Sequence, residues 1–141
     1  SQLLKLDTFI RRRRELAKQY RKHFEKNPNL KSAQSIDLNR SANHLYPILI
    51  DFDALGFSRN DLIKLLRKDG ILTQVHYIPV IKHPYYANLG HKCDLFPNSV
   101  DYYESTLSIP LYYGLTDIDQ RNFIKIFEKN ISHLSKNGNL V

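Results

Sequence analysis

The first 26 residues carry an apolar stripe at helical spacing, and a helix of that length has to bury its stripe against something. Asn27, Pro28 and Asn29 end this helix, because proline cannot continue a helix and disfavours helical geometry at the residue before it. No convincing cap precedes Gln2, so we expect the native helix to begin upstream of Ser1. The apolar positions recur at intervals of three, four or seven residues: Leu3, Leu6, Ile10, Ala17, Tyr20 and Phe24.

The same helix carries a dense basic run, which raises the question of a polyanionic partner. The formal net charge is +7 and the isoelectric point is near 9.5. Most of the basic positions lie opposite the apolar stripe, so we interpret them as a solvated helix face and expect no nucleic-acid partner. The alternative, nucleic-acid binding, predicts an affinity that falls steeply as salt rises. The run comprises Arg11, Arg12, Arg13, Arg14, Lys18, Arg21, Lys22 and Lys26.

Three runs rich in branched and aromatic residues predict strands over 45–52, 71–78 and 106–112. Pro110 places the last of them at a sheet edge or ends it at Ile109. The segment 29–43 is polar and reads as a loop with room for a short extended piece, and 79–97 reads as a long loop with one helical turn around residues 85–89.

Further helices are predicted over 58–70, 98–104 and 116–134. Ser58 and Gly70 cap the first of these helices, and Thr116 caps the last. The last helix should bury Ile118, Phe123, Ile124, Phe127 and Ile131. We therefore expect an α+β fold, in which helices pack on one face of a small, mostly antiparallel three-stranded sheet that follows a long helix.

The length of 141 residues and the hydrophobic content of 42% suffice for one sizeable core. We divide the chain into a connecting helix (1–28), one small domain (29–134) and a disordered tail (135–141). The single cysteine, Cys93, cannot form an internal disulfide and is expected to be a partly buried thiol. No apolar run approaches the length of a bilayer span, so we expect a soluble cytoplasmic protein without a membrane partner.

His76 is the foremost candidate for a functional side chain. It falls near the end of the predicted strand 71–78, with Tyr77 after it and Pro79 beyond, where the loop turns it toward whatever the domain faces. An imidazole there can donate a hydrogen bond to a carboxylate or a hydroxyl. The alternative is a core histidine that has simply found a hydrogen-bond partner.

Other chemistries find little support in the chain. His76, His83, His91 and Cys93 have no closed zinc-ligand spacing, so we expect no metal site. There is no glycine-rich phosphate loop and no nucleophile elbow. No lysine lies in an apolar setting that would lower its pKa for Schiff-base chemistry, and Lys82, the nearest to one, is expected to be a solvated loop residue. We expect no catalytic and no cofactor-binding residue in this chain.

Four short phrases at specific spacings carry a family resemblance: residues 44–48, 70–79, 96–97 and 107–111. With residues 2–3, 6–7, 12–13 and 115–116 they resemble the C-terminal domain of the DegT/DnrJ/EryC1/StrS sugar aminotransferases. The resemblance implies the small domain of a fold-type I enzyme that uses pyridoxal phosphate (PLP) to move an amino group from glutamate to a keto sugar nucleotide, for polysaccharide or glycan biosynthesis. It also implies a large PLP-binding domain upstream of Ser1 and a homodimer formed through that domain.

The resemblance assigns substrate-binding roles to His76, Tyr77, Ile78 and His83, which would line a wall facing the nucleotide sugar or glutamate. Residues 44–46 would belong to the strand that supports this wall. Many members have a second histidine where this chain has Ile81. The sequence of residues 75–80 is similar to that of the pseudaminic acid branch of the family. This similarity implies a UDP-linked 4-keto sugar as the substrate.

Two readings follow. In the first, the chain is the C-terminal part of a working aminotransferase and is inactive by itself, because the lysine that would bind PLP is absent. In the second, it is a non-catalytic remnant or stand-alone binding module of the same fold, from a split or decayed gene. The second reading predicts that the surface onto which the large domain would dock has become polar.

Overall fold

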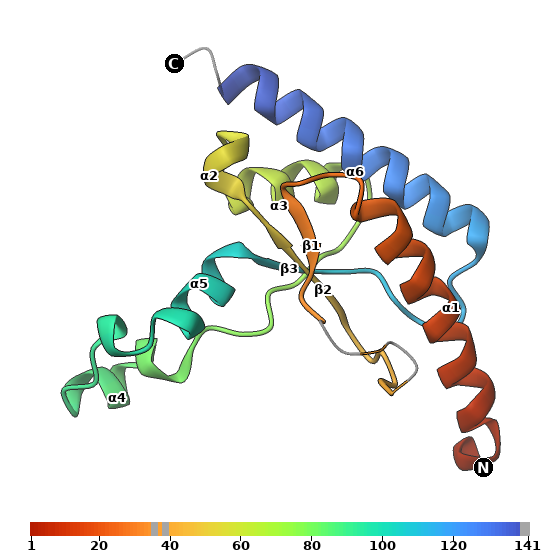
Figure 1. Ribbon diagram of the computed structural model, residues 1–141, viewed down its shortest axis with the longest axis horizontal. Helices are drawn as coiled ribbons and strands as arrows, with labels where there is room; N and C mark the ends of the chain where they lie inside the picture. The colour runs from red at the N-terminus through yellow and green to blue at the C-terminus, as the bar shows by residue number, and fades with distance from the viewer. Residues whose placement is uncertain (35–36, 38–39, 139–141) are drawn as a thin grey trace.

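The protein folds around a three-stranded antiparallel sheet covered by long helices, as a computed structural model describes for residues 1–34, 37 and 40–138 (Figure 1). The strands are β1 (Leu30–Ser32), β2 (Tyr46–Ile50) and β3 (Thr106–Ile109), in the order β1-β2-β3. The long helices are α1 (Leu6–Phe24), α3 (Arg59–Lys68) and α6 (Asp117–Gly138). The shorter helices are η1 (Gln2–Lys5), α2 (Phe52–Leu55), η2 (Val80–Lys82), α4 (Pro84–Asn88), η3 (Cys93–Leu95) and α5 (Pro97–Ser105). The predicted fold class is confirmed.

One of the three strands in the sheet is not the strand that the sequence predicted. The run 71–78 is not a strand, because it contributes only a single antiparallel bridge, between Gln74 and Ser108. Its side chains do alternate between half-buried and exposed from Ile71 to Val75. The alternation in the sequence therefore indicated correctly which side chains face the protein, but it did not indicate strand pairing. The third strand is β1, within the segment 29–43, which was predicted as a loop with room for a short extended piece. β3 ends at Ile109 and lies at an edge, as Pro110 predicted.

One continuous core joins the sheet to α1, α3 and α6. Side chains of β2 alternate between buried and half-buried, so Tyr46, Ile48 and Ile50 face the helices. Tyr20 lies at the centre of an aromatic cluster, and its hydroxyl donates a hydrogen bond to the carbonyl of Pro110 at 2.9 Å. The helices contribute Leu16, Ala17, Tyr20, Phe24, Leu62, Leu66, Phe123, Ile124, Phe127 and Ile131. Helix α1 is therefore an integral part of this core.

The two helix ends that the sequence marked most clearly are capped as predicted. The Ser58 side chain accepts a hydrogen bond from the backbone of Asp61, and Thr116 accepts one from Asp119. Gly70, just beyond α3, has a φ of 77°, a left-handed conformation that glycine adopts readily.

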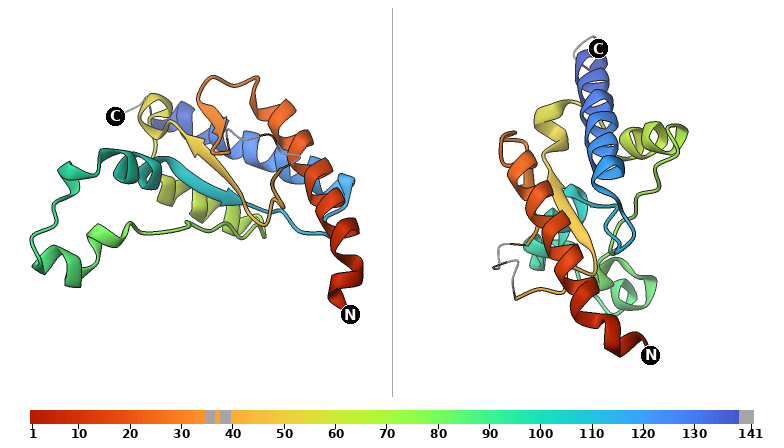
Figure 2. Two further views of the ribbon diagram at one scale, coloured as in Figure 1. Left: turned by 60° about the horizontal axis from the view of Figure 1, so that its bottom comes forward. Right: turned by 90° about the vertical axis from the view of Figure 1, so that its right-hand side faces the viewer.

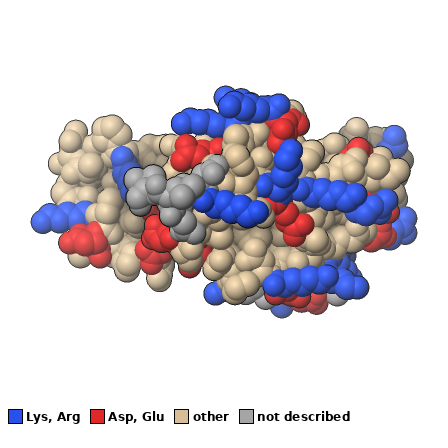
Figure 3. Space-filling view, turned by 90° about the horizontal axis from the view of Figure 1, so that it is seen from above, with Lys and Arg blue, Asp and Glu red and all other residues tan. Residues whose placement is uncertain are grey.

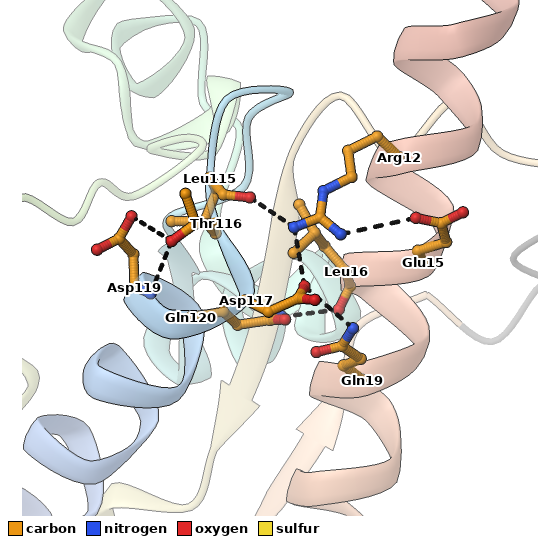
Figure 4. A network of polar contacts seen from close by, with 9 residues as sticks. All are labelled: Arg12, Glu15, Leu16, Gln19, Leu115, Thr116, Asp117, Asp119 and Gln120. Atoms are coloured by element: carbon orange, nitrogen blue, oxygen red, sulfur yellow. Dashed lines mark hydrogen bonds and ion pairs between the residues drawn. The ribbon is translucent and has the colours of Figure 1, made fainter.

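The buried stripe of α6 begins at Gln120, two residues later than predicted. Ile118 is 63% exposed, whereas Gln120 is fully buried. The Gln120 amide donates a hydrogen bond of 2.8 Å to the carbonyl of Leu16, so the inner face of the helix starts with a polar tie to α1 (Figure 4). The expected disordered tail is wrong for residues 135–138, because α6 runs to Gly138, and residues 139–141 lie outside the described residues.

Several arginines of the basic run are not purely solvated, which corrects the sequence interpretation. Arg12 donates to the carbonyl of Leu115 at 2.7 Å and pairs with Asp117 at 2.8 Å (Figure 4). Arg14 donates to the carbonyl of Ser41 at 3.0 Å. These side chains tie α1 to neighbouring loops. On the face shown in Figure 3, basic and acidic side chains are interspersed rather than gathered in one basic patch.

The N-terminal part of the predicted apolar stripe is exposed rather than buried. Leu3, Leu4 and Leu6 are exposed, and burial on this helix begins only near Leu16. Figures 1 and 2 show the reason, since this end of the helix projects beyond the sheet and the other helices. The apolar pattern of the sequence is therefore correct for the helix, but the described chain leaves its first turns uncovered.

Residues 77–105 form an arm that extends away from the sheet on the side opposite the N-terminus (Figures 1 and 2). The predicted long loop lies here, and the helical turn predicted around 85–89 is confirmed by α4. Cys93 is exposed, not partly buried. Large apolar side chains of the arm are exposed as well: Tyr77, Ile78, Val80, Tyr85, Tyr86, Leu89, Leu95 and Phe96.

Candidate functional site

His76 lies beside β3 at the base of the arm, in a position fixed by the Gln74 bridge. The backbone N–H of Ser108 donates to the Gln74 carbonyl at 2.8 Å, and the N–H of Gln74 donates to the Ser108 carbonyl at 3.2 Å. In an antiparallel pair, opposite residues share a face, and a residue two positions further along is a diagonal neighbour. His76 therefore reaches Ser108, and its Nδ1 lies 2.8 Å from the Ser108 Oγ.

The imidazole is half-buried and held on a second side by an aromatic ring. Its plane meets the Tyr77 ring at 88°, with the ring centres 4.7 Å apart. Among the described residues, its Nε2 makes no hydrogen bond. Tyr77 itself is 73% exposed, and Ile78 is exposed too. His76 thus combines an anchored nitrogen with a free one next to an exposed aromatic surface.

A shallow groove of about 490 Å³ runs between the start of the arm and α5. Its walls are Tyr77, Pro79, Val80, Ile81, Asn98, Ser99 and Tyr102. Of the four predicted substrate-binding residues, Tyr77 lines this groove. His83 is exposed at the start of α4 and does not line it, whereas Ile81, at the position where many members have a histidine, does. The groove is therefore apolar at that position.

Lys82, which we expected to be a solvated loop residue, is exposed and also has an ion-pair partner. Its Nζ lies 2.6 Å from a carboxylate oxygen of Glu104 and 4.7 Å from the centre of the Tyr103 ring. Arg59 contacts the same ring at 4.7 Å and donates to backbone carbonyls of α5 and β3, including that of Thr106 at 3.3 Å. Together these contacts fasten the base of the arm to α3 and α5.

These contacts also decide how the chain relates to PLP. A lysine that forms a Schiff base needs a lowered pKa, but the hydrogen bond to Glu104 raises the pKa of Lys82. No lysine among the described residues is buried. Within residues 1–34, 37 and 40–138, therefore, no lysine has the setting that a Schiff base with PLP requires.

Metal binding and membrane crossing also find no support among the described residues. No group of three or more histidine, cysteine, aspartate or glutamate side chains is arranged to hold a metal ion within residues 1–34, 37 and 40–138. Across the same ranges, no helix has the length and apolar character needed to cross a membrane.

Residues 1–128 match the model of the DegT/DnrJ/EryC1/StrS aminotransferase family. The chain belongs to this family. The resemblance predicted from the sequence is confirmed at this level, and the family is one of sugar aminotransferases that serve polysaccharide and glycan amino-sugar biosynthesis.

Individual relatives match nearly all of this chain but only part of their own length. The spore coat polysaccharide biosynthesis protein SpsC of Bacillus subtilis is 40% identical over 126 residues, which cover 88% of this chain and 32% of SpsC. A Campylobacter jejuni protein named UDP-4-amino-4,6-dideoxy-N-acetyl-beta-L-altrosamine transaminase is 35% identical, over 89% of this chain and 32% of its own. The structure of Helicobacter pylori PseC, an aminotransferase involved in pseudaminic acid biosynthesis, superimposes with a TM-score of 0.83 at 29% identity, over 94% of this chain and 35% of PseC. The chain spans about a third of the length of the curated relatives it matches.

The sequence did not reveal every residue at this site. The sequence predicts Ser108 as part of the strand 106–112, and Asn98, Ser99 and Tyr102 as part of the helix 98–104. One signal in the sequence concerns Ser108. Its hydroxyl stands between Leu107 and Ile109 in the predicted strand, and a hydroxyl that is buried in such a strand needs a partner. The groove residues of α5 carried no such signal, because only the folding back of the arm brings them to Tyr77.

Proposed function

We propose that this chain is the C-terminal part of a PLP-dependent aminotransferase that transfers an amino group from glutamate to a keto sugar nucleotide. In this proposal, His76, Tyr77, Ile78 and His83 contribute to the wall of the substrate site. PLP, with its lysine, belongs to the remainder of a longer enzyme. The homodimer forms through that remainder, and the whole acts in the cytoplasm.

One observation carries the proposal beyond the family match, namely the state of His76. Its Nδ1 is committed to Ser108, while its Nε2 has no partner among the described residues and lies beside the exposed ring of Tyr77. A core histidine in a merely structural role would be expected to have both nitrogens paired within the protein. A glutamate carboxylate and a sugar diphosphate both present oxygen acceptors that such a nitrogen can bind.

The apolar arm favours this proposal over the remnant or stand-alone module. A remnant that no longer docks onto a large domain should lose exposed apolar side chains, because they are an aggregation liability. The arm instead exposes several of them, including Tyr85, Leu89 and Leu95, and the N-terminal turns expose Leu3 and Leu4. These surfaces support a chain that is covered by further protein in its working form.

The resemblance to the pseudaminic acid branch supports a UDP-linked 4-keto sugar as the substrate. The transaminase of Campylobacter jejuni and PseC of Helicobacter pylori are among the relatives. The apolar Ile81 in the groove beside Tyr77 sets this chain apart from members that have a histidine there. We propose that this part of the wall contacts an apolar portion of the substrate rather than a charged one.

A hybrid enzyme tests the proposal. Residues 1–141 would replace the matching third of the Campylobacter jejuni transaminase, and amino transfer from glutamate to the UDP-linked keto sugar would be measured. The variant His76→Ala is compared with His133→Ala, which removes an exposed histidine of α6, a helix that contributes no residue to the groove. Loss of one hydrogen bond to a charged group should lower kcat/KM roughly 10- to 100-fold for His76→Ala, with no change for His133→Ala.

Two results would contradict the proposal in different ways. A hybrid that folds and binds PLP but transfers no amino group would argue against the assigned reaction. A hybrid whose kcat/KM is the same with and without His76 would preserve the reaction and remove His76 from the substrate site.

A further inference from the structure

Ser108 presents its hydroxyl on the face of the sheet that points away from the main core. In the pairing of β2 with β3, Tyr46 lies opposite Ile109 and Ile48 opposite Leu107, and these four side chains face the helices. Because side chains alternate along a strand, Ser108 faces the other way. It is nevertheless only 6% exposed, since the segment that carries His76 lies over it.

The position of the Ser108 hydroxyl is fixed by the backbone on both sides. Its N–H and carbonyl are both bonded to Gln74, and its neighbours Leu107 and Ile109 pair with β2. The serine side chain has a single rotatable bond before the oxygen. With the backbone fixed, Oγ can take only three staggered positions, and the one that it occupies places it 2.8 Å from the His76 Nδ1.

The direction of the hydrogen bond between Ser108 and His76 follows from the proton of the hydroxyl. Among the described residues, the Ser108 Oγ makes no hydrogen bond other than the one of 2.8 Å to Nδ1. If Nδ1–H donated to Oγ, the buried hydroxyl proton would be left without an acceptor. Buried donors without acceptors are rarer than acceptors with an unused lone pair. The hydroxyl therefore donates to Nδ1, and the neutral ring carries its proton on Nε2.

We propose that Ser108 is a positioning residue that sets both the orientation and the tautomer of His76 for ligand binding. This inference rests on the proposed role of His76 in the substrate site. A ring flip would turn a carbon atom toward the Ser108 hydroxyl and leave that hydroxyl unpaired, so the bond holds the ring in one orientation. The free Nε2–H is then a donor, which is what the acceptor-only oxygens of a carboxylate or a phosphate require.

Nitrogen-15 NMR of the histidine rings in the 141-residue chain tests this inference without any ligand or cofactor. The spectra are recorded well above the titration range of histidine, so that the ratio of the two neutral tautomers of His76 can be read. Ser108→Ala should lower the ratio of the Nε2–H to the Nδ1–H tautomer about fivefold, the equivalent of one ordinary hydrogen bond. Ser108→Thr keeps the hydroxyl and should restore the ratio.

A matched control removes a different hydroxyl nearby. Ser105→Ala deletes a side chain that bonds to the Asp101 carbonyl and not to His76, so the His76 tautomers should not change. The backbone amide spectra of all three variants establish that each is folded. An unchanged ratio in folded Ser108→Ala would overturn the inference, and so would a wild-type ring that is mainly in the Nδ1–H form.

In the hybrid enzyme, a positioning role has its own signature. Ser108→Ala should lower kcat/KM about fivefold, and the double variant His76→Ala, Ser108→Ala should be no worse than His76→Ala alone, because Ser108 acts through the ring. Additive effects of the two substitutions would contradict the inference. An inactive hybrid would count against the proposed function only, since the NMR result is obtained on this chain by itself.

Discussion

Replacing Tyr20 by phenylalanine tests how α1 is joined to the rest of the domain. The substitution keeps the buried ring within its aromatic cluster and removes only the hydroxyl, which donates to the Pro110 carbonyl at 2.9 Å. Loss of one buried hydrogen bond should lower the free energy of unfolding by about 1–2 kcal/mol at neutral pH. With a urea m-value of about 2 kcal/mol/M, the midpoint should fall by roughly 0.5–1 M.

The pH dependence sharpens this prediction. Burial, as the main cause, raises the pKa of the Tyr20 hydroxyl above the ordinary tyrosine value. The stability that this group contributes is therefore fully present below the unfolded pKa of about 10 and is lost as pH rises beyond it. Each further pH unit should lower the stability of the wild-type chain by about 1.4 kcal/mol through this group, whereas Tyr20→Phe has no such loss. The two chains should become equally stable near pH 11.

Urea unfolding followed by far-ultraviolet circular dichroism is the appropriate assay, because the chain contains no tryptophan. Tyr113→Phe serves as the control, since that tyrosine is exposed and its hydroxyl makes no hydrogen bond within the described residues. The reasoning would be refuted if Tyr20→Phe matched the wild-type chain at neutral pH. It would also be refuted if a difference between the two persisted unchanged above pH 10.

Three further predictions concern the last helix and its contacts. Thr116→Ala removes the cap of α6 and should destabilise the chain by about 1 kcal/mol, seen as a lower Tm in a thermal melt. Arg12 is the main cause that lowers the pKa of Asp117, so their pairing stabilises the fold above the ordinary aspartate pKa and is lost as pH falls through the lowered value. Arg12→Ala should therefore flatten the acid side of the stability profile, and an unchanged acid limb in urea titrations would argue against the pair. Ile118→Lys should leave the urea midpoint nearly unchanged, whereas Phe127→Ala should cost about 3–5 kcal/mol, and a large loss of stability in Ile118→Lys would return Ile118 to the buried stripe predicted from the sequence.

The sequence was a reliable guide wherever one short segment contained the whole signal. The caps Ser58 and Thr116 hold the backbone amides of residues only three positions away, and Pro110 acts on its own strand. The short segments that carry the family resemblance are also local, so the fold and the family could both be predicted. Local patterns of this kind need no knowledge of the tertiary structure.

The features that the sequence did not reveal depend on partners distant along the chain. The ion pair between Lys82 and Glu104 was not predicted, because the two residues meet only when the arm folds back. Gln120 replaced Ile118 on the buried face because its amide finds the Leu16 carbonyl, 104 positions away. β1 has a single buried apolar residue, so its sequence shows no strand pattern. It is a strand because its backbone pairs with β2.

Part of the candidate site was predictable from local sequence. His76 and Tyr77 lie in a short segment that carries the family resemblance, so the sequence identified them as candidates. Ser108 became visible as the partner of His76 only through the bridge between Gln74 and β3, which no local pattern encodes. A residue that orients another side chain is recognised from the contact between them, and a local sequence pattern does not contain that contact.

The bridge at Gln74 also bears on how this small sheet avoids joining with the sheets of other molecules. An open edge strand offers unpaired amides to any neighbouring strand and so invites amyloid-like growth. Here Gln74 occupies the Ser108 amide and carbonyl, and Pro110 follows with no N–H to offer. The opposite edge, β1, is three residues long. Self-association of this chain should therefore proceed through the apolar side chains of its arm, leaving β-sheet content unchanged as oligomers form.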